Sequence, residues 1–108
     1  RNAVMVQIKI TPNAKKDIRG IYVYILKDSY QNAELVAEAI IRKIETLKKK
    51  PDFGKIVKEF NDPLIRELKL FKYRIIYRLK TASSVEIITI QHSSRLLNNN
   101  PHLNDFFE

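Results

Sequence analysis

The sequence contains no cysteine and no tryptophan, and only two of its 108 residues are glycine. Without cysteine, the chain forms neither disulfides nor thiolate metal sites. Two glycines are too few for a glycine-rich phosphate-binding loop. No signal peptide is visible, and the longest apolar runs fall far below the roughly 20 residues of a membrane-spanning helix. These absences favour a cytoplasmic protein that does not enter a membrane.

Residues that carry chemistry are also scarce. The two histidines, His92 and His102, lie ten residues apart with no further ligand at metal-binding spacing. Ser93 and Ser94 follow His92, but the sequence shows neither an orienting acid nor an oxyanion site for a catalytic triad. We therefore expect no metal and no cofactor, and we set aside metalloenzymes and serine hydrolases.

Positive charge is abundant and unevenly distributed. The chain carries 20 Lys and Arg against 12 Asp and Glu, a formal net charge of +8. Residues 48–80 hold 11 basic and four acidic residues, so this stretch accounts for +7. A basic patch of this kind indicates a polyanionic or acidic partner, although it also serves solubility.

The first half of the chain predicts a strand followed by two helices. Ala3–Ile10 alternates apolar and polar residues, which is typical of a strand. Thr11 and Pro12 then predict a helix start, and an apolar stripe continues to Ile25. Ser29 is a candidate cap for a second helix, which we expect to end before Pro51.

The second half predicts three strands and a polar tail. A short polar turn separates the last two strands, which favours an antiparallel hairpin. The whole chain thus predicts one α+β domain of residues 1–108, with its core at about 4–96 and a C-terminal tail at 97–108. We expect an antiparallel sheet with a helical hairpin on one face. The predicted strands are Leu64–Leu70, Lys72–Lys80 and Ser84–His92.

The stretch KYRIIYRLK places charged side chains on the sheet face that we expect to carry no helix. Arg74 and His92 lie on strands that we expect to pair. Guanidinium groups bind phosphates and an imidazole can move a proton, so such a set could cleave RNA through its own 2′-hydroxyl. Alternatively, these side chains make ordinary backbone and surface contacts. The candidate binding residues are Lys72, Arg74, Arg78, Lys80, His92 and Arg95, and the candidate catalytic residues among them are Arg74, His92 and Arg95.

Four stretches together resemble a known family in their order and spacing. They are ITPNAKKDIRGIYVYI (10–25), IETLKKKPDFGKIVKEF (44–60), RELKLFKYRIIYRL (66–79) and VEIITIQHSSR (85–95). On these stretches the chain resembles the RelE/ParE toxin superfamily, whose fold matches the predicted one. The resemblance implies a toxin of a type II toxin–antitoxin pair, neutralised by an acidic, partly disordered antitoxin.

The resemblance leaves the target open. RelE-like members cut mRNA on the ribosome without a metal, whereas ParE-like members inhibit DNA gyrase. Arg74 and Arg95 match arginines of the nucleases, but residues 96–101 offer no Tyr or His for the acid or base, and His102 is a doubtful substitute. A catalytic residue from the middle of the chain could be Lys55, Lys58 or Glu59. We rank gyrase inhibition first, the mRNA endonuclease second and a non-toxic binding module third.

Overall fold

The computed structural model describes residues 5–107, except for the side chains of Asp105 and Phe107. Ala3 and Val4 of the predicted first strand lie outside this range. A five-stranded sheet runs in the order β1-β5-β4-β3-β2. Its strands are β1 (Gln7–Ile10), β2 (Lys55–Ile56), β3 (Ile65–Leu70), β4 (Tyr73–Thr81) and β5 (Ser84–His92).

The predicted α+β class and the order of the main elements are confirmed, and the sheet itself is mixed. β2 to β5 pair antiparallel, but β1 pairs parallel with β5, with Gln7 opposite Ser84. A parallel pair needs a long crossover between its strands. Here everything between β1 and β5 forms that crossover, so the first and last strands are neighbours.

Both helices of the hairpin start where the sequence predicts. In α1 (Pro12–Leu26), the Thr11 hydroxyl accepts a hydrogen bond from the Ala14 amide at 3.2 Å and donates one to the Ile87 carbonyl at 2.8 Å. In α2 (Tyr30–Glu45), the Ser29 hydroxyl accepts from the Asn32 amide at 3.1 Å. These caps satisfy amides that the first helical turn leaves without partners.

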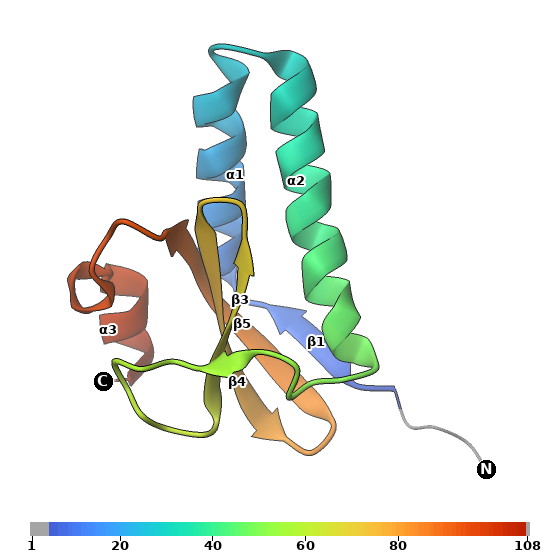
Figure 1. Ribbon diagram of the computed structural model, residues 1–108, viewed down its shortest axis with the longest axis vertical. Coiled ribbons are helices and arrows are strands. Elements are labelled where there is room, and N and C mark those ends of the chain that lie inside the picture. The colour runs from blue at the N-terminus through green and yellow to red at the C-terminus, as the bar shows by residue number, and fades with distance from the viewer. Residues whose placement is uncertain (1–4, 108) are drawn as a thin grey trace.

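The helical hairpin covers one face of the sheet and projects beyond it (Figure 1). The Tyr22 hydroxyl donates to the Glu34 carboxylate at 2.6 Å and thereby joins α1 to α2. The core on this face combines helix and sheet residues, so the strand residues with odd numbers in β4 point toward the helices. Its buried members include Ala14, Ile40, Ile44, Leu68, Ile75, Tyr77, Val85, Ile87 and Ile90.

The opposite face also carries a helix, which differs from the sequence-based expectation. A second apolar cluster lies there, formed by Val57, Ile65, Ile76, Ile88, Leu97 and Leu103, with Phe106 packed against it. A short 3-10 turn, η2 (Leu97–Asn99), and α3 (Pro101–Phe107) supply the cover. The predicted tail is therefore an ordered element, and the face bearing Arg74 and Arg78 is partly buried.

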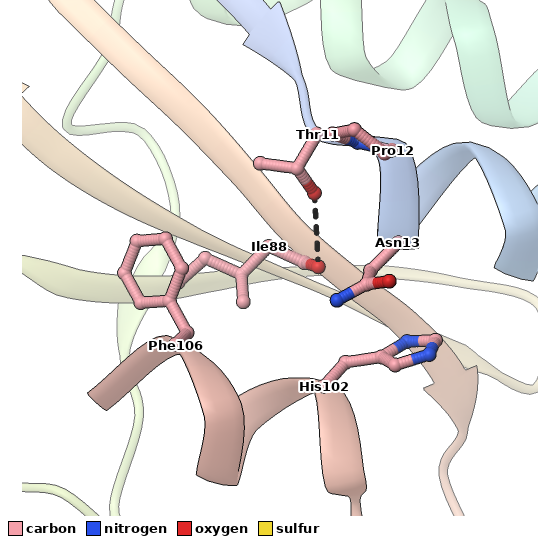
Figure 2. A pocket seen from close by; sticks show the side chains of 6 residues that line it. All are labelled: Thr11, Pro12, Asn13, Ile88, His102 and Phe106. Carbon is pink, nitrogen blue, oxygen red and sulfur yellow. Dashed lines mark hydrogen bonds between the residues drawn. The ribbon is translucent and has the colours of Figure 1, made fainter. Parts of the chain in front are cut away.

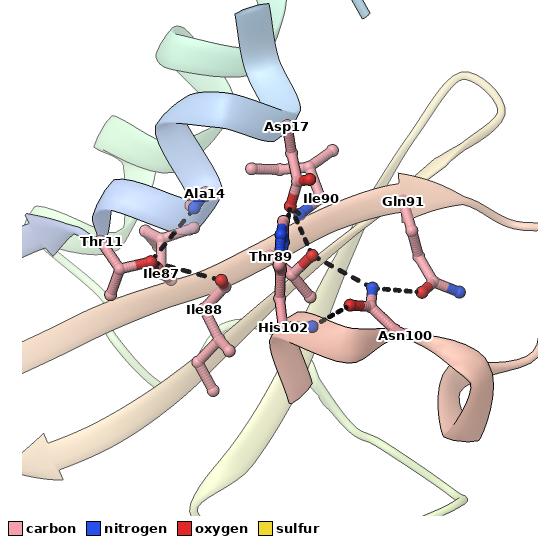
Figure 3. A network of polar contacts seen from close by, with 10 residues as sticks. All are labelled: Thr11, Ala14, Asp17, Ile87, Ile88, Thr89, Ile90, Gln91, Asn100 and His102. Carbon is pink, nitrogen blue, oxygen red and sulfur yellow. Dashed lines mark hydrogen bonds and ion pairs between the residues drawn. The ribbon is translucent and has the colours of Figure 1, made fainter. Parts of the chain in front are cut away.

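A polar network holds α3 against β5 and α1 (Figure 3). One oxygen of Asp17 accepts hydrogen bonds from the Thr89 hydroxyl at 2.5 Å and the Ile90 amide at 3.1 Å. The same oxygen lies 3.1 Å from Nδ1 of His102, at the start of α3. Asn100 donates to the Gln91 side chain at 2.7 Å. β1 ends at Ile10, so Asp17 satisfies part of the edge of β5 that β1 leaves open.

A small cavity of about 200 Å³ lies beside this network, between α1, β5 and α3. The side chains of Asn13 and His102 lie close together at one end, and Phe106 lies at the other (Figure 2). His102 therefore serves mainly to attach α3.

Within residues 5–107, no helix is long and apolar enough to cross a membrane.

The connection between α2 and β3 contains the short strand β2, which pairs with β3, where the sequence led us to expect only irregular structure from Phe53 to about Pro63. The part of this connection around Gly54 packs against Tyr77. Tyr77 is fully buried, and its hydroxyl accepts a hydrogen bond from the Gly54 amide at 2.9 Å and donates one to the Pro51 carbonyl at 2.8 Å. A Cβ at Gly54 would lie 2.6 Å from that hydroxyl and 2.6 Å from the Glu67 carbonyl oxygen. Only glycine fits such a close approach without movement.

Candidate functional site

Arg74, one of the predicted site residues, lies between two carboxylates. Its guanidinium donates to Glu67 at 2.6 and 2.9 Å, and to Glu59 at 3.1 and 3.2 Å. The Arg74 side chain is only 11% exposed, the Glu67 side chain 8% and the Glu59 side chain 45%. Glu67 comes from the neighbouring strand β3, and Glu59 comes from the connection that precedes it. The fork of Arg74 is therefore fully engaged by the protein itself.

The electrostatics of this cluster favour the ionised forms of Arg74 and Glu59. Hydrogen bonds to Glu67, and then to Glu59, raise the pKa of the Arg74 guanidinium above its ordinary value. The hydrogen bond from Arg74 lowers the pKa of Glu59. One guanidinium and two carboxylates leave a net charge of −1 at neutral pH. The N–H groups of the Arg74 guanidinium are already bonded to these carboxylates, so they are not free to bind a phosphate.

Arg78 and Lys80 also meet a carboxylate. Arg78 donates to Glu86 at 2.8 Å, and the Lys80 ammonium lies 3.8 Å from the same buried carboxylate. The Arg78 guanidinium lies 4.8 Å from the ring centre of Phe106, a cation–π distance. Its Nε is buried without a hydrogen-bond partner. Arg78 thus helps to attach α3, and Lys80 keeps a half-exposed side chain at the far end of β4.

His92 is the last residue of β5, and Arg95 lies in the turn that follows it. The Ser94 amide donates to Nδ1 of His92 at 3.1 Å, and the Ser94 hydroxyl lies 2.7 Å from the same nitrogen. In a neutral ring the proton therefore sits on Nε2. The Arg95 amide donates to the His92 carbonyl, whereas its side chain is exposed. No ion pair of Arg95 is found among the described residues.

The sheet register places His92 and Arg74 on opposite faces. His92 is directly opposite Tyr73, and the two rings meet edge to face at 5.9 Å. Residues directly opposite in an antiparallel pair share a face. Tyr73 packs on the helical-hairpin core, so His92 lies on that side, whereas Arg74 lies on the side of Ile76 and α3. The structure does not assemble the predicted set of Arg74, His92 and Arg95 around one point.

Other predicted candidates stay at the surface. Lys72 is exposed in the turn between β3 and β4, and Lys55 and Lys58 are exposed near β2. Beside Glu59 lies a groove of about 690 Å³ between the connection before β3 and the C-terminal segment. Phe60, Leu96, Leu97 and Leu103 supply its apolar lining. In the described residues no group of three His, Asp or Glu side chains is placed to hold a metal ion.

The sequence-based reasoning missed the acidic partners of the arginines. Glu67 precedes Arg74 by seven residues, and the β3–β4 hairpin brings them together. A hairpin prediction with a two-residue turn would have placed Glu67 and Arg74 on the same face. No local signal points to Glu59, because its position depends on how the irregular connection folds.

Comparison with protein families gives a decisive match. The model of the family described as the ParE toxin of the type II toxin–antitoxin system parDE matches residues 8–97. The chain belongs to the ParE toxin family. Among curated proteins, no sequence matches this ParE-family toxin.

Solved structures share the fold of this ParE-family toxin. One from the chromosomal ParDE toxin–antitoxin system of P. aeruginosa has 22% identity and a TM-score of 0.67, covering 83% of this chain and 98% of its own. A structure of the RelBE2 toxin–antitoxin complex of Mycobacterium tuberculosis has 17% identity and a TM-score of 0.60, and the match covers 87% of this chain and 98% of the other. A mutant of the E. coli toxin RelE in the free state has 15% identity and a TM-score of 0.59, and the match covers 93% of this chain and 92% of the other. These likenesses establish the RelE/ParE-like fold.

Proposed function

We propose that this ParE-family toxin inhibits DNA gyrase and does not cleave RNA. It acts as a single toxin domain in the bacterial cytoplasm, and a cognate antitoxin neutralises it. The observation that carries the proposal is the state of Arg74, whose guanidinium is saturated by Glu59 and Glu67. The match to the ParE family supports the same target.

The nuclease alternative requires a different arrangement. Attack of a ribose 2′-hydroxyl builds negative charge on the phosphate, and catalysis needs cationic groups aimed at that charge. Here the guanidinium of the central arginine is already bonded to Glu59 and Glu67, and His92 lies on the other face of the sheet. A phosphate would have to displace Glu59 before it could reach Arg74. Such competition would reduce binding of RNA at this position.

The antitoxin partner follows from charge and from the related complexes. The chain carries a net charge of +8, and an acidic segment would neutralise part of it. The related RelBE2 structure is a toxin–antitoxin complex. We propose that target or antitoxin contacts use Lys72, His92 and Arg95, whose side chains remain accessible. Arg74, Arg78 and Lys80 contribute less, because each already faces a carboxylate.

The proposal is tested by assaying the purified chain, freed of antitoxin, in two reactions. The first contains gyrase and supercoiled plasmid and measures trapped, cleaved DNA. The second contains ribosomes programmed with a message and measures cut RNA. Naked message without ribosomes is the control for the second reaction.

Cleaved plasmid with intact message is the expected result. Cut message with intact plasmid would overturn the proposal and would make the exposed Arg95 the first catalytic candidate. Silence in both reactions from a folded protein would favour a binding module without toxicity. Adding antitoxin should suppress the activity, and its association should slow strongly as salt rises.

A further inference from the structure

The turn between β3 and β4 presents an aromatic ring to solvent. Leu70 and Tyr73 pair directly, so Phe71 and Lys72 form a two-residue turn. Phe71 has a φ of 54° and is 62% exposed. This turn and the end of β5 lie at the end of the sheet nearest the tip of the helical hairpin (Figure 1). A large apolar side chain thus sits at a prominent point.

Stability does not explain a phenylalanine at this position. A positive φ is uncommon outside glycine, is met mostly by Asn, Asp or His, and is an outlier for a bulky residue. At its one other such position in the described residues, the chain has an asparagine, Asn61, with a φ of 49°. Phe71 buries little surface in return for its strained backbone. Strain of this kind is typical of positions that serve binding.

Basic residues lie on both sides of Phe71 in the chain and in the adjoining turn. Lys69 and Lys72 flank it along the chain and are exposed. The Ser93 amide and hydroxyl donate to the Lys72 carbonyl at 2.7 and 2.8 Å, which places the turn bearing Arg95 against the turn bearing Phe71. Among the side chains that the structure describes, no carboxylate forms an ion pair with Lys69, Lys72 or Arg95. We call Lys69, Phe71, Lys72 and Arg95 the hairpin patch.

We propose that the hairpin patch binds single-stranded nucleic acid, with Phe71 stacking on a base and the three cations contacting phosphates. Exposed aromatic rings among basic residues are the usual means of binding single strands without sequence preference. The exposed residues that adjoin Phe71 in its own turn and in the turn that bears Arg95 are charged or polar, and the exposed apolar Leu96 follows Arg95. The inference deepens the proposed function, since gyrase works on DNA, but its test needs no gyrase.

The test is a titration of labelled oligonucleotides by fluorescence anisotropy at several salt concentrations. The probes are oligothymidylate, oligouridylate, a short duplex, an abasic single strand and a poly-glutamate peptide. The variants are Phe71→Asn, which suits a positive φ, Phe71→Tyr, which keeps the ring, and the triple change Lys69→Gln, Lys72→Gln, Arg95→Gln. The matched control, Lys49→Gln, removes an exposed charge near the end of α2, away from the patch.

The expected result separates the ring from the charges. Phe71→Asn should weaken single-strand binding roughly tenfold, leave abasic binding unchanged and raise the melting temperature, whereas Phe71→Tyr should bind like the wild type. The triple variant should reduce the salt slope by about two, at about 0.7 per phosphate contact. Lys49→Gln should change little. Comparing the affinities for oligothymidylate and oligouridylate shows whether the patch prefers DNA or RNA.

Three results would overturn the inference. They are a wild-type chain that binds no oligonucleotide, a Phe71→Asn variant that binds as tightly as the wild type, and a Phe71→Asn loss that is equal on poly-glutamate. The last would assign the patch to an acidic protein. Gyrase inhibition is scored separately, so inhibition that survives loss of the patch would leave the proposed function standing.

Discussion

Replacing Arg74 with alanine tests directly whether this arginine serves the fold or a substrate. In the structure Arg74 neutralises Glu67, whose side chain is 8% exposed. The substitution would leave that carboxylate buried with no cation beside it, because Glu67 lies in the middle of β3. Glu59 would lose its partner too, but it is 45% exposed and water would replace the lost contact.

The magnitude follows from the burial of the pair. Removing one partner of a buried ion pair typically costs about 3–5 kcal/mol. Arg74 keeps 11% exposure, so we expect the lower end of this range. For a domain of this size each kcal/mol shifts the melting temperature by roughly 4–8 °C. Arg74→Ala should therefore lower the melting temperature by more than about 10 °C.

The assay is thermal and urea unfolding followed by circular dichroism at neutral pH. Arg42→Ala, an exposed arginine on α2, is the matched control and should change stability little. Replacing both partners, as Arg74→Leu with Glu67→Leu, should recover most of the loss, because no buried charge is then left alone.

An Arg74→Ala protein that melts within a few degrees of the wild type would refute this reasoning. It would show that Glu67 is well solvated without Arg74 and that the arginine is free to serve a ligand. The same variant would then have to be tested first in the ribosome reaction.

Three further predictions concern stability. The hydrogen bond from Arg74 lowers the pKa of Glu59 in the folded protein. The ionised Glu59 therefore adds to the free energy of unfolding above the ordinary carboxyl pKa of about 4.3, and this stabilisation is lost as pH falls through the lower folded pKa. Urea midpoints should therefore decline more steeply in the wild type than in Glu59→Gln below about pH 5. Tyr77→Phe should lower the free energy of unfolding by roughly 1–3 kcal/mol, because the Gly54 amide loses its hydrogen-bond partner. Gly54→Ala should be similarly destabilising, because the added Cβ would collide with the Tyr77 hydroxyl and the Glu67 carbonyl. A urea midpoint equal to that of the wild type would contradict either prediction. Asp17→Asn should increase hydrogen exchange in α3 more than in β4, because Asp17 links α1 to His102; uniform exchange would argue against that link.

Local signals in the sequence predicted the caps and the last strand well. Thr11 and Ser29 are caps because short hydroxyl side chains before an apolar stripe satisfy free amides. Ser84–His92 was predicted with both its ends, because alternation and flanking polar residues mark a strand without help from the rest of the fold. The RelE/ParE-like order of elements could be predicted for the same reason.

The contacts of Arg74, the cover of the basic sheet face and the position of His92 depend on long-range contacts that local sequence patterns do not predict. Whether Arg74 is free depends on Glu59, which an irregular connection places beside it. The basic face was expected to be uncovered, but α3 packs there through Leu103 and Phe106, and no strong periodicity announces so short a helix. The face occupied by His92 depends on its register with Tyr73, which the strand boundaries alone do not fix.

A titration of the purified chain into gyrase and plasmid tests whether this ParE-family toxin acts on gyrase. The measurement is the amount of linear DNA released after protein denaturation, with parallel reactions that lack gyrase. We expect linear DNA that rises with toxin, appears only when gyrase is present and disappears when antitoxin is added first. Unchanged plasmid at every toxin concentration, from a chain shown to be folded, would contradict it.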